Sequence, residues 1–385
     1  VQDHHGPESM AHGLTKLCNI CVPLSISAAV ILVWRYRAAA LFSHGLYARR
    51  RRRLPFHKVR RAVFRFDETE TEHRTESPTP FLLTQVPLGP CIERWTPEYL
   101  ASTIGKMSIS AHISETSGLS FAQKNFSYAK MTIAEFLERA QTEKKYFYYR
   151  SMHADRNKPS SMDIFGPLAD EFQLPPVLLD GFQLHSTVLR IASAGLRMWL
   201  HYDICDNFLC CIRGRKRVVL IPPCHVDSLY VKDSSSLLGS RALERDQASL
   251  AALWREFPLA ESAWAQRSEI ELDEGDALFI PALWLHCTEA LPHKSTKPGS
   301  SSELCVSTNI FFIRPEQASL HDRKDIWANR ELLPAQEAFK VLDDRLLPAL
   351  SRTPPDYCAF YCRKASAALL SMARQTELKG FSTDA

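Results

Sequence analysis

A histidine and an aspartate lie two positions apart in LRMWLHYDICDN, residues 196–207, a stretch that is otherwise mostly apolar. Side chains at positions i and i+2 of an extended strand point to the same side, so His201 and Asp203 are expected to project together. His286 follows 85 residues later in ALWLHCTEAL, at the end of another predicted strand. Two histidines and one carboxylate can bind a cation and leave adjacent coordination positions open, which is typical of non-haem Fe(II) oxygenases.

The three residues alone do not establish a metal site. A histidine and an aspartate at this spacing occur often by chance, and a single histidine such as His286 is more commonly a hydrogen-bonded core or surface residue than a ligand. The neighbouring sequence therefore has to separate the two interpretations.

Short β-rich runs surround these residues. Residues 180–222 contain FQLHSTVLRIAS, MWLHYDI, NFLCCIRG and KRVVLIPP, and SEIELDEGDALFIPALWLHCTEAL and LCVSTNIFFI follow a serine- and charge-rich connection at 232–262. IRGRK, centred on Gly214, predicts a hairpin turn. Consecutive short strands with tight turns favour an antiparallel barrel or jelly roll of about eight strands over a parallel sheet.

Helices are predicted on both sides of this β core. TPEYLASTIG has a helix start at Thr96-Pro97, and MTIAEFLERAQ carries apolar residues at helical spacing. After residue 316, DIWANRELLPAQEAFKVLDDRLLPAL and YCAFYCRKASAALLSMARQ show the same spacing of three and four. We expect an N-terminal extension and linker at 1–79 that is poorly ordered, a domain at 80–315, and C-terminal helices at 316–380.

The charge is unevenly distributed along a chain of globular composition, 45% hydrophobic and 23% charged. Residues 1–66 contain 12 lysines and arginines and 2 acids, whereas the remainder contains 35 and 41. The acidic balance of the body does not indicate a nucleic-acid partner, and such a contact needs a local basic patch. Two clusters are candidates for phosphate binding, although charge runs are usually solvated surfaces: Arg213, Arg215, Lys216 and Arg217; and Lys144, Lys145, Arg150, Arg156 and Lys158.

The N-terminal segment has more than one interpretation. Residues 17–34 are mostly apolar, and five arginines occupy 49–53. The segment fits a membrane anchor, an organelle transit peptide, or sequence outside the folded domain. The 11 cysteines show no pair of CxxC motifs at zinc-like spacing, which favours free thiols in a reducing compartment. We expect an intracellular protein, cytoplasmic or nuclear, with an anchor or transit peptide in 10–66 as the alternatives.

Three motifs carry a family resemblance. HYDICDN, GRKRVVLIPP and LDEGDALFIPALWLH occur in this order over about ninety residues and resemble the JmjC-domain dioxygenases of the cupin superfamily. The resemblance implies a double-stranded β-helix that binds Fe(II) and 2-oxoglutarate and uses O2. It implies the following site residues: His201, Asp203 and His286 as iron ligands, and Lys216, Asn207 and Tyr148 as 2-oxoglutarate contacts, with Tyr146 or Tyr149 in place of Tyr148 if the register differs.

The chemistry of the cosubstrate supports one of these assignments independently. A dicarboxylate in a barrel requires a cation and hydroxyl donors at its far end, and a buried lysine ammonium without an anion is costly. Lys216 begins a strand directly after the Gly214 turn, but three neighbouring arginines also fit a solvated turn. Met198 departs from the pattern, because some family members have a threonine there that touches 2-oxoglutarate.

The resemblance narrows to one branch of the family. VPLGPCIERWTPEYL, QKNFSYAKM, VLRIASAGLRMWLHYDICDN and DYCAFYCRK are similar to the tRNA wybutosine-synthesizing JmjC hydroxylases over residues 80 to about 375. That resemblance implies hydroxylation of the wybutosine-precursor side chain of phenylalanine tRNA, and a homodimer formed by the C-terminal helices. The loops at 232–262 and 291–303 are longer than those of the family and are serine-rich.

Three alternatives remain. A JmjC protein side-chain hydroxylase, a lysine demethylase and a catalytically silent cupin share the same core. Nothing in the chain resembles the chromatin-reader modules or zinc clusters that often accompany demethylases, which argues against that branch.

Overall fold

The computed structural model describes residues 59–63, 79–120, 123–294 and 304–382. These residues all belong to one compact unit, which spans Arg53–Ala385. The apolar segment 17–34 and the arginines at 49–53 lie outside the described residues, so the structure does not address the anchor and transit-peptide interpretations. No helix within the described part of the chain is long and apolar enough to cross a membrane.

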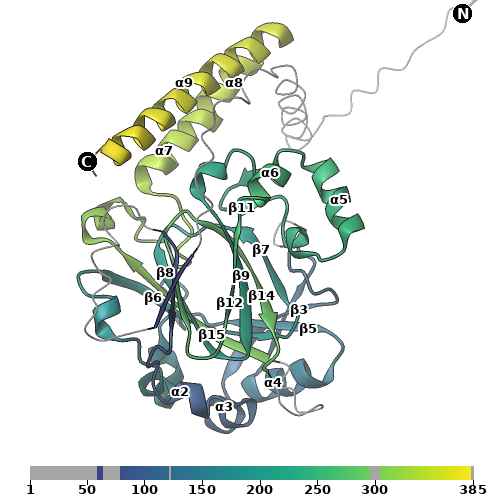
Figure 1. The fold of residues 1–385 in the computed structure, drawn as a ribbon, viewed down its shortest axis with the longest axis vertical. Helices are drawn as coiled ribbons and strands as arrows, with labels where there is room; N and C mark the ends of the chain where they lie inside the picture. The colour runs from purple at the N-terminus through teal and green to yellow at the C-terminus, as the bar shows by residue number, and fades with distance from the viewer. Residues whose placement is uncertain (1–58, 64–78, 121–122, 295–303, 383–385) are drawn as a thin grey trace, which may run out of the picture. The chain divides into compact units, whose positions relative to one another are not determined.

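Two sheets form the body of the domain (Figure 1). In the described residues the large sheet has nine strands, in the spatial order β1 (Arg60–Val63), β2 (Phe81–Thr84), β13 (Ala277–Ile280), β8 (Asp206–Arg213), β15 (Leu304–Ile313), β6 (Gln183–Ser193), β5 (Tyr146–Arg150), β3 (Ser108–Ser114) and β4 (Ser127–Thr132). The small sheet has six, in the order β10 (Val231–Lys232), β11 (Ser235–Ser236), β7 (Arg197–His201), β14 (Leu285–Leu291), β9 (Arg215–Ile221) and β12 (Ser268–Leu272).

The central strands alternate between the sheets along the chain. β6, β8, β13 and β15 lie in the large sheet, whereas β7, β9, β12 and β14 lie in the small one, and neighbours among them pair antiparallel. A chain that crosses repeatedly between two facing antiparallel sheets forms a jelly roll, and this confirms the predicted fold class. Side chains on the facing sides of the two sheets enclose the space in which the candidate site lies.

Gly214 makes the tight turn between β8 and β9. Its φ of +76° is accessible to glycine, and a Cβ at this position would lie 3.0 Å from the carbonyl oxygen of Leu304. The predicted turn is therefore present. The predicted hairpin is wrong, because β8 pairs with β13 and β15 while β9 pairs with β12 and β14, so that the turn carries the chain from one sheet to the other.

Short helices pack against the large sheet, and their buried side chains form a hydrophobic cluster with those of the sheet. They are α2 (Cys91–Arg94), α3 (Pro97–Ile104) and α4 (Ile133–Thr142). The hydroxyl of Thr96 caps α3, as the helix start at Thr96-Pro97 predicts. Thr132 and Glu135 form a capping box at α4. α4 buries Ile133, Phe136, Leu137 and Ala140, the spacing of one helix face, in the same cluster as large-sheet residues. Burial of a phenylalanine such as Phe136 stabilises the fold by about 1.5–3 kcal/mol.

The segment 232–262 is structured and reaches β7, the strand that ends at His201. It contains β10, β11, α5 (Gln247–Glu256) and the start of α6 (Ala260–Trp264). β11 pairs with β7, with Ser235 opposite His201. β1 adds a further strand, which pairs parallel with β2 and lies inside the range that the sequence analysis assigns to the N-terminal extension.

Three helices follow the jelly roll: α7 (Leu333–Val341), α8 (Leu347–Ser351) and α9 (Pro355–Ser382), with a π-helical segment at Leu342–Leu346 between the first two. The predicted helical span that starts at residue 325 is wrong at its beginning. The Asp325 carboxylate accepts the backbone N–H groups of Trp327 and Arg330 and holds an irregular segment instead. No side chain of α7 or α8 is buried, nor is any described side chain of α9 up to residue 377.

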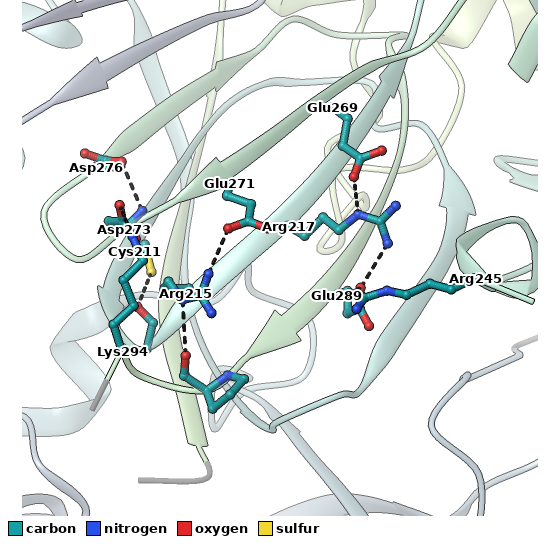
Figure 2. A network of polar contacts seen from close by, with 12 residues as sticks. Cys211, Arg215, Arg217, Arg245, Glu269, Glu271, Asp273, Asp276, Glu289 and Lys294 are labelled. Atoms are coloured by element: carbon teal, nitrogen blue, oxygen red, sulfur yellow. Dashed lines mark hydrogen bonds and ion pairs between the residues drawn. The ribbon is translucent and has the colours of Figure 1, made fainter. Parts of the chain in front are cut away.

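The strands β9, β12 and β14 of the small sheet carry cross-strand ion pairs (Figure 2). Arg215 lies 2.8 Å from Glu271, and Arg217 lies 2.5 Å from Glu269 and 3.0 Å from Glu289. Lys216, between the two arginines, is buried. The first basic cluster of the sequence is therefore largely neutralised, which removes its support as a phosphate-binding patch.

Candidate metal centre and its pocket

The two histidines and the aspartate meet at one end of the facing sheets. His201 is the last residue of β7 and lies directly opposite His286 of β14. Asp203 follows in the connection to β8, and its backbone carbonyl accepts the N–H of Leu283 at 2.9 Å. One ligand atom from each of the three side chains lies within 4.8 Å of the others, and His286 Nε2 is 3.5 Å from Asp203 Oδ2. The predicted clustering of the three residues is thus present.

Hydrogen bonds fix the orientation of both imidazoles. Nδ1 of His201 is 2.8 Å from the carbonyl oxygen of Trp199, and Nδ1 of His286 is 2.9 Å from that of Trp284. A carbonyl can only accept, so each Nδ1 carries the proton and donates it. Each Nε2 then presents its lone pair, which is the form of histidine that ligates a metal.

The charge of the site also fits a cation. Burial raises the pKa of the Asp203 carboxyl, although the nearby His286, Arg190 and Arg150 oppose the shift. Burial, followed by the proximity of His286, holds the pKa of His201 well below its ordinary value, so that its imidazole stays neutral. Two imidazoles and a carboxylate in a confined space are the donors that divalent transition metals bind, so the residues fit Fe(II).

A pocket extends from these residues between the sheets. It is lined by Tyr148, Arg190, Ala192, Leu196, Met198, His201, Asp203, Leu209, Lys216, Ile280, His286, Thr288, Ala290 and Asn309. The ligand set, two cations and several hydroxyl and amide groups thus share one cavity with apolar walls. Such a combination is the expected form of a small-molecule site.

Two of the predicted 2-oxoglutarate contacts line the pocket. The Lys216 side chain is buried, and its Nζ donates to Ser307 Oγ at 2.7 Å. The Tyr148 hydroxyl accepts a hydrogen bond from Arg190 and keeps its own proton available. Tyr149 instead packs in the core on the other face of the large sheet, and Tyr146 is not a lining residue, so the register favours Tyr148.

Asn207 lies just behind the pocket wall. It is 1% exposed, and its Oδ1 accepts a hydrogen bond from Asn309, which does line the cavity. Its Nδ2 is buried with no hydrogen-bond partner among the described residues. A buried amide N–H without an acceptor is costly, so a bound oxygen ligand reaching this point would satisfy it.

Three lining residues were missed in the sequence: Arg190, Asn309 and Thr288. Arg190 in VLRIAS and Asn309 in STNIFF interrupt apolar strands, the same signal that distinguishes His201, but no motif spacing marks them. Thr288 lies opposite Met198 in the pairing of β14 with β7. The hydroxyl that Met198 lacks is therefore present on the adjacent strand of the same pocket.

Comparison with known proteins agrees with this fold. The model of the family described as cupin-like domain matches residues 67–318. The chain belongs to this family and has a cupin-like domain of the JmjC type.

The chain is similar to proteins named tRNA wybutosine-synthesizing protein 5 or 4. The chain is 35% identical to tRNA wybutosine-synthesizing protein 5 of Danio rerio over 296 residues, which cover 74% of this chain and 83% of the relative. It is 33% identical to the protein of the same name from Homo sapiens over 305 residues, 76% of this chain and 89% of the relative. It is also 31% identical to tRNA wybutosine-synthesizing protein 4 of Emericella nidulans, over 80% of this chain but 27% of that longer protein.

Proposed function

We propose that this protein is an Fe(II)- and 2-oxoglutarate-dependent hydroxylase that acts on the wybutosine-precursor side chain of phenylalanine tRNA. The observation that carries the proposal is the His201, Asp203 and His286 cluster in one pocket with the buried Lys216. Homologues named as tRNA wybutosine-synthesizing proteins support the tRNA substrate. A tRNA substrate in turn implies an intracellular place of action.

Each part of the pocket has a role in this proposal. His201, Asp203 and His286 would hold the metal, and Lys216 and Tyr148 would hold the far carboxylate of 2-oxoglutarate. Asn207 contributes its amide from behind the wall. When bound, iron and 2-oxoglutarate supply the oxygen activation that no side chain can provide. The apolar walls limit access of water to the reacting groups.

Phenylalanine tRNA from cells that lack this gene tests the proposal. Mass spectrometry should show the unhydroxylated precursor, and the wild-type gene should restore the hydroxylated base while Asp203→Asn should not. An unchanged hydroxylated base in the deletion strain would disprove the tRNA assignment. Succinate formation stimulated by a protein or peptide, and not by this tRNA, would instead favour a protein hydroxylase.

We also propose that the C-terminal helices form a homodimer interface. Large apolar side chains on α7 to α9 and the segment between them are exposed in the single chain: Leu333, Phe339, Val341, Leu346, Leu347, Tyr357, Phe360, Tyr361, Leu369, Leu370 and Met372. A run of apolar surface of this extent is typical of a protein interface. A second copy of the same helices is the partner that symmetry makes available.

A further inference from the structure

Two arginines lie opposite each other beside the metal pocket. Arg150 ends β5 and Arg190 lies in the middle of β6, and the two are paired across the antiparallel strands. Both side chains are partly buried. Arg150 belongs by sequence to a basic cluster, and the structure places it opposite Arg190 across β5 and β6.

Neither guanidinium forms an ion pair with an acid of the described chain. Arg190 donates from Nε to Asn309 Oδ1 at 2.7 Å and from Nη1 to the Tyr148 hydroxyl. The only hydrogen bond given by Arg150 within the described residues is a long one, 3.4 Å, to the carbonyl oxygen of Ser151. An arginine carries five N–H donors, so most donors of the pair remain available.

The environment makes this arrangement costly in the absence of an anion. Burial, and secondarily the neighbouring charge of Arg190, lower the pKa of Arg150 to about 9. Asp203 is close enough to both arginines to feel their charge, but it belongs to the metal ligands. Asp325 also acts on Arg150 through its charge, but its carboxylate accepts the backbone N–H groups of Trp327 and Arg330 and forms no ion pair with either arginine. Two like charges without a directly paired counter-charge are destabilising at a partly buried position, and an anionic ligand would offset this cost.

The two arginines lie between the pocket and the protein surface. Arg190 lines the cavity that holds the metal ligands. Arg150 lies under the indole of Trp327, with its guanidinium carbon 4.2 Å from the ring centroid, and Trp327 is 36% exposed. The arginines thus connect the reacting end of the pocket with an aromatic ring at the surface.

Charge balance indicates what the pair would hold. In the proposed function, an Fe(II) ion, the Asp203 carboxylate, a 2-oxoglutarate dianion and the Lys216 ammonium balance one another. Arg150 and Arg190 then carry two positive charges next to a neutral centre, against the single negative charge of Asp325, which forms no ion pair with them. A planar guanidinium pair matches the oxygens of a carboxylate or phosphate.

We propose that Arg150 and Arg190 form an anion subsite that holds a carboxylate or phosphate of the substrate beside the metal centre. Trp327 forms the outer wall of this subsite. The inference deepens the proposed function and rests on it for the identity of the substrate. It differs from a purely structural role, in which Arg190 would only position Tyr148 and Arg150 would only pack against Trp327.

Kinetics with two forms of the substrate test the subsite. Phenylalanine tRNA from the deletion strain supplies the unhydroxylated base, which nucleases release as a nucleoside monophosphate and phosphatase converts to the nucleoside. Arg150→Gln is expected to raise KM about tenfold or more with kcat nearly unchanged, the signature of lost ground-state and transition-state binding alike. Lys106→Gln, which removes one exposed charge just before β3, the neighbour of β5, is the control and should change KM less than threefold.

The two substrate forms identify the anionic group. If the effect of Arg150→Gln is equal for nucleoside and nucleoside monophosphate, the subsite holds a carboxylate of the base side chain. If only the monophosphate shows the effect, it holds the phosphate. Arg150→Lys and Arg190→Lys keep the charge and should recover most of the affinity, and 2-oxoglutarate affinity should not respond to Arg150→Gln.

A binding measurement keeps the test independent of the reaction. Inorganic phosphate is titrated calorimetrically into protein loaded with Mn(II) and 2-oxoglutarate without oxygen, and binding that Arg150→Gln and Arg190→Gln weaken at least about tenfold supports the subsite. If wild type does not hydroxylate the tRNA but shows this binding, the proposed function fails and the subsite stands. If neither substrate nor phosphate affinity responds to the arginine substitutions more than to Lys106→Gln, the subsite is refuted.

Discussion

Replacement of Lys216 by methionine should stabilise the ligand-free protein and abolish its response to 2-oxoglutarate. The ammonium is 5% exposed, and its only hydrogen bond within the described residues goes to Ser307 Oγ. No carboxylate of the described residues lies within ion-pair distance of Lys216 Nζ. The buried ammonium therefore lowers the stability of the ligand-free protein, and an anion bound in the pocket would offset this loss.

The expected magnitude follows from two opposing contributions. Substitution of well-packed apolar groups for buried charged groups stabilises proteins by about 1–4 kcal/mol. The Ser307 hydroxyl is fully buried and would lose its bond from Lys216, which costs about 1 kcal/mol. The two contributions leave a net gain of about 0–3 kcal/mol for Lys216→Met. Its midpoint of about 1.5 kcal/mol corresponds to a rise of roughly 3–6 °C in the melting temperature.

The ligand should reverse the order of stability. At 100 times its dissociation constant, 2-oxoglutarate stabilises the wild-type protein by about 2.7 kcal/mol and the variant not at all. Melting curves are recorded with Mn(II) in place of iron, with and without 2-oxoglutarate, and Lys144→Met serves as the exposed control. Two results would refute this expectation: a Lys216→Met variant that is less stable than wild type without ligand, or a variant whose melting temperature 2-oxoglutarate still raises.

Three further outcomes are expected. Asp203→Asn removes the proposed carboxylate ligand and should weaken the affinity for Mn(II), measured by electron paramagnetic resonance. Loss of a residue that only hydrogen-bonds to a metal ligand costs about 10–100-fold in metal affinity, and loss of the ligand itself should cost more. Burial lowers the pKa of His112 to about 4 from 6.5, so the unfolded chain binds the proton more readily and stability should fall as the pH drops from 6.5 to 4. The loss is about 3 kcal/mol, and His112→Leu should flatten this part of the stability profile measured by urea unfolding. Phe360→Glu on α9, where the ring is 61% exposed, should convert the proposed homodimer to monomers in light scattering.

Matched variants define how these expectations fail. Asp273→Asn changes an exposed carboxylate and should leave Mn(II) affinity intact, and an equal loss in both variants would contradict the ligand assignment. An acid transition that His112→Leu leaves unchanged would show that other groups cause it. Tyr128→Glu alters another exposed ring, 63% exposed on β4, and a shift to monomers with this variant as well would argue against the helices as the interface.

The local elements were predictable from the sequence because local interactions determine them. Thr96-Pro97 begins α3, and the apolar spacing of MTIAEFLERAQ produces α4 with its capping box. Gly214 marks a turn, since its positive φ favours glycine. The partners of the strands on either side of that turn were not predictable in the same way, because the choice between a hairpin and a crossing to the other sheet depends on distant strands.

One part of the candidate site was predictable from the sequence, and another part depended on the tertiary structure. Sequence by itself predicted the candidate ligand set, since His201, Asp203 and His286 stand in a specific order with the Lys216 motif, and it indicated the jelly roll through short strands and tight turns. Only the tertiary structure decided that Tyr148 and not Tyr149 faces the pocket, that Arg215 and Arg217 are neutralised, and that Arg150 meets Arg190. The side to which a strand residue points follows from its alternation, but the residue it meets there depends on the register of strands far apart in the chain.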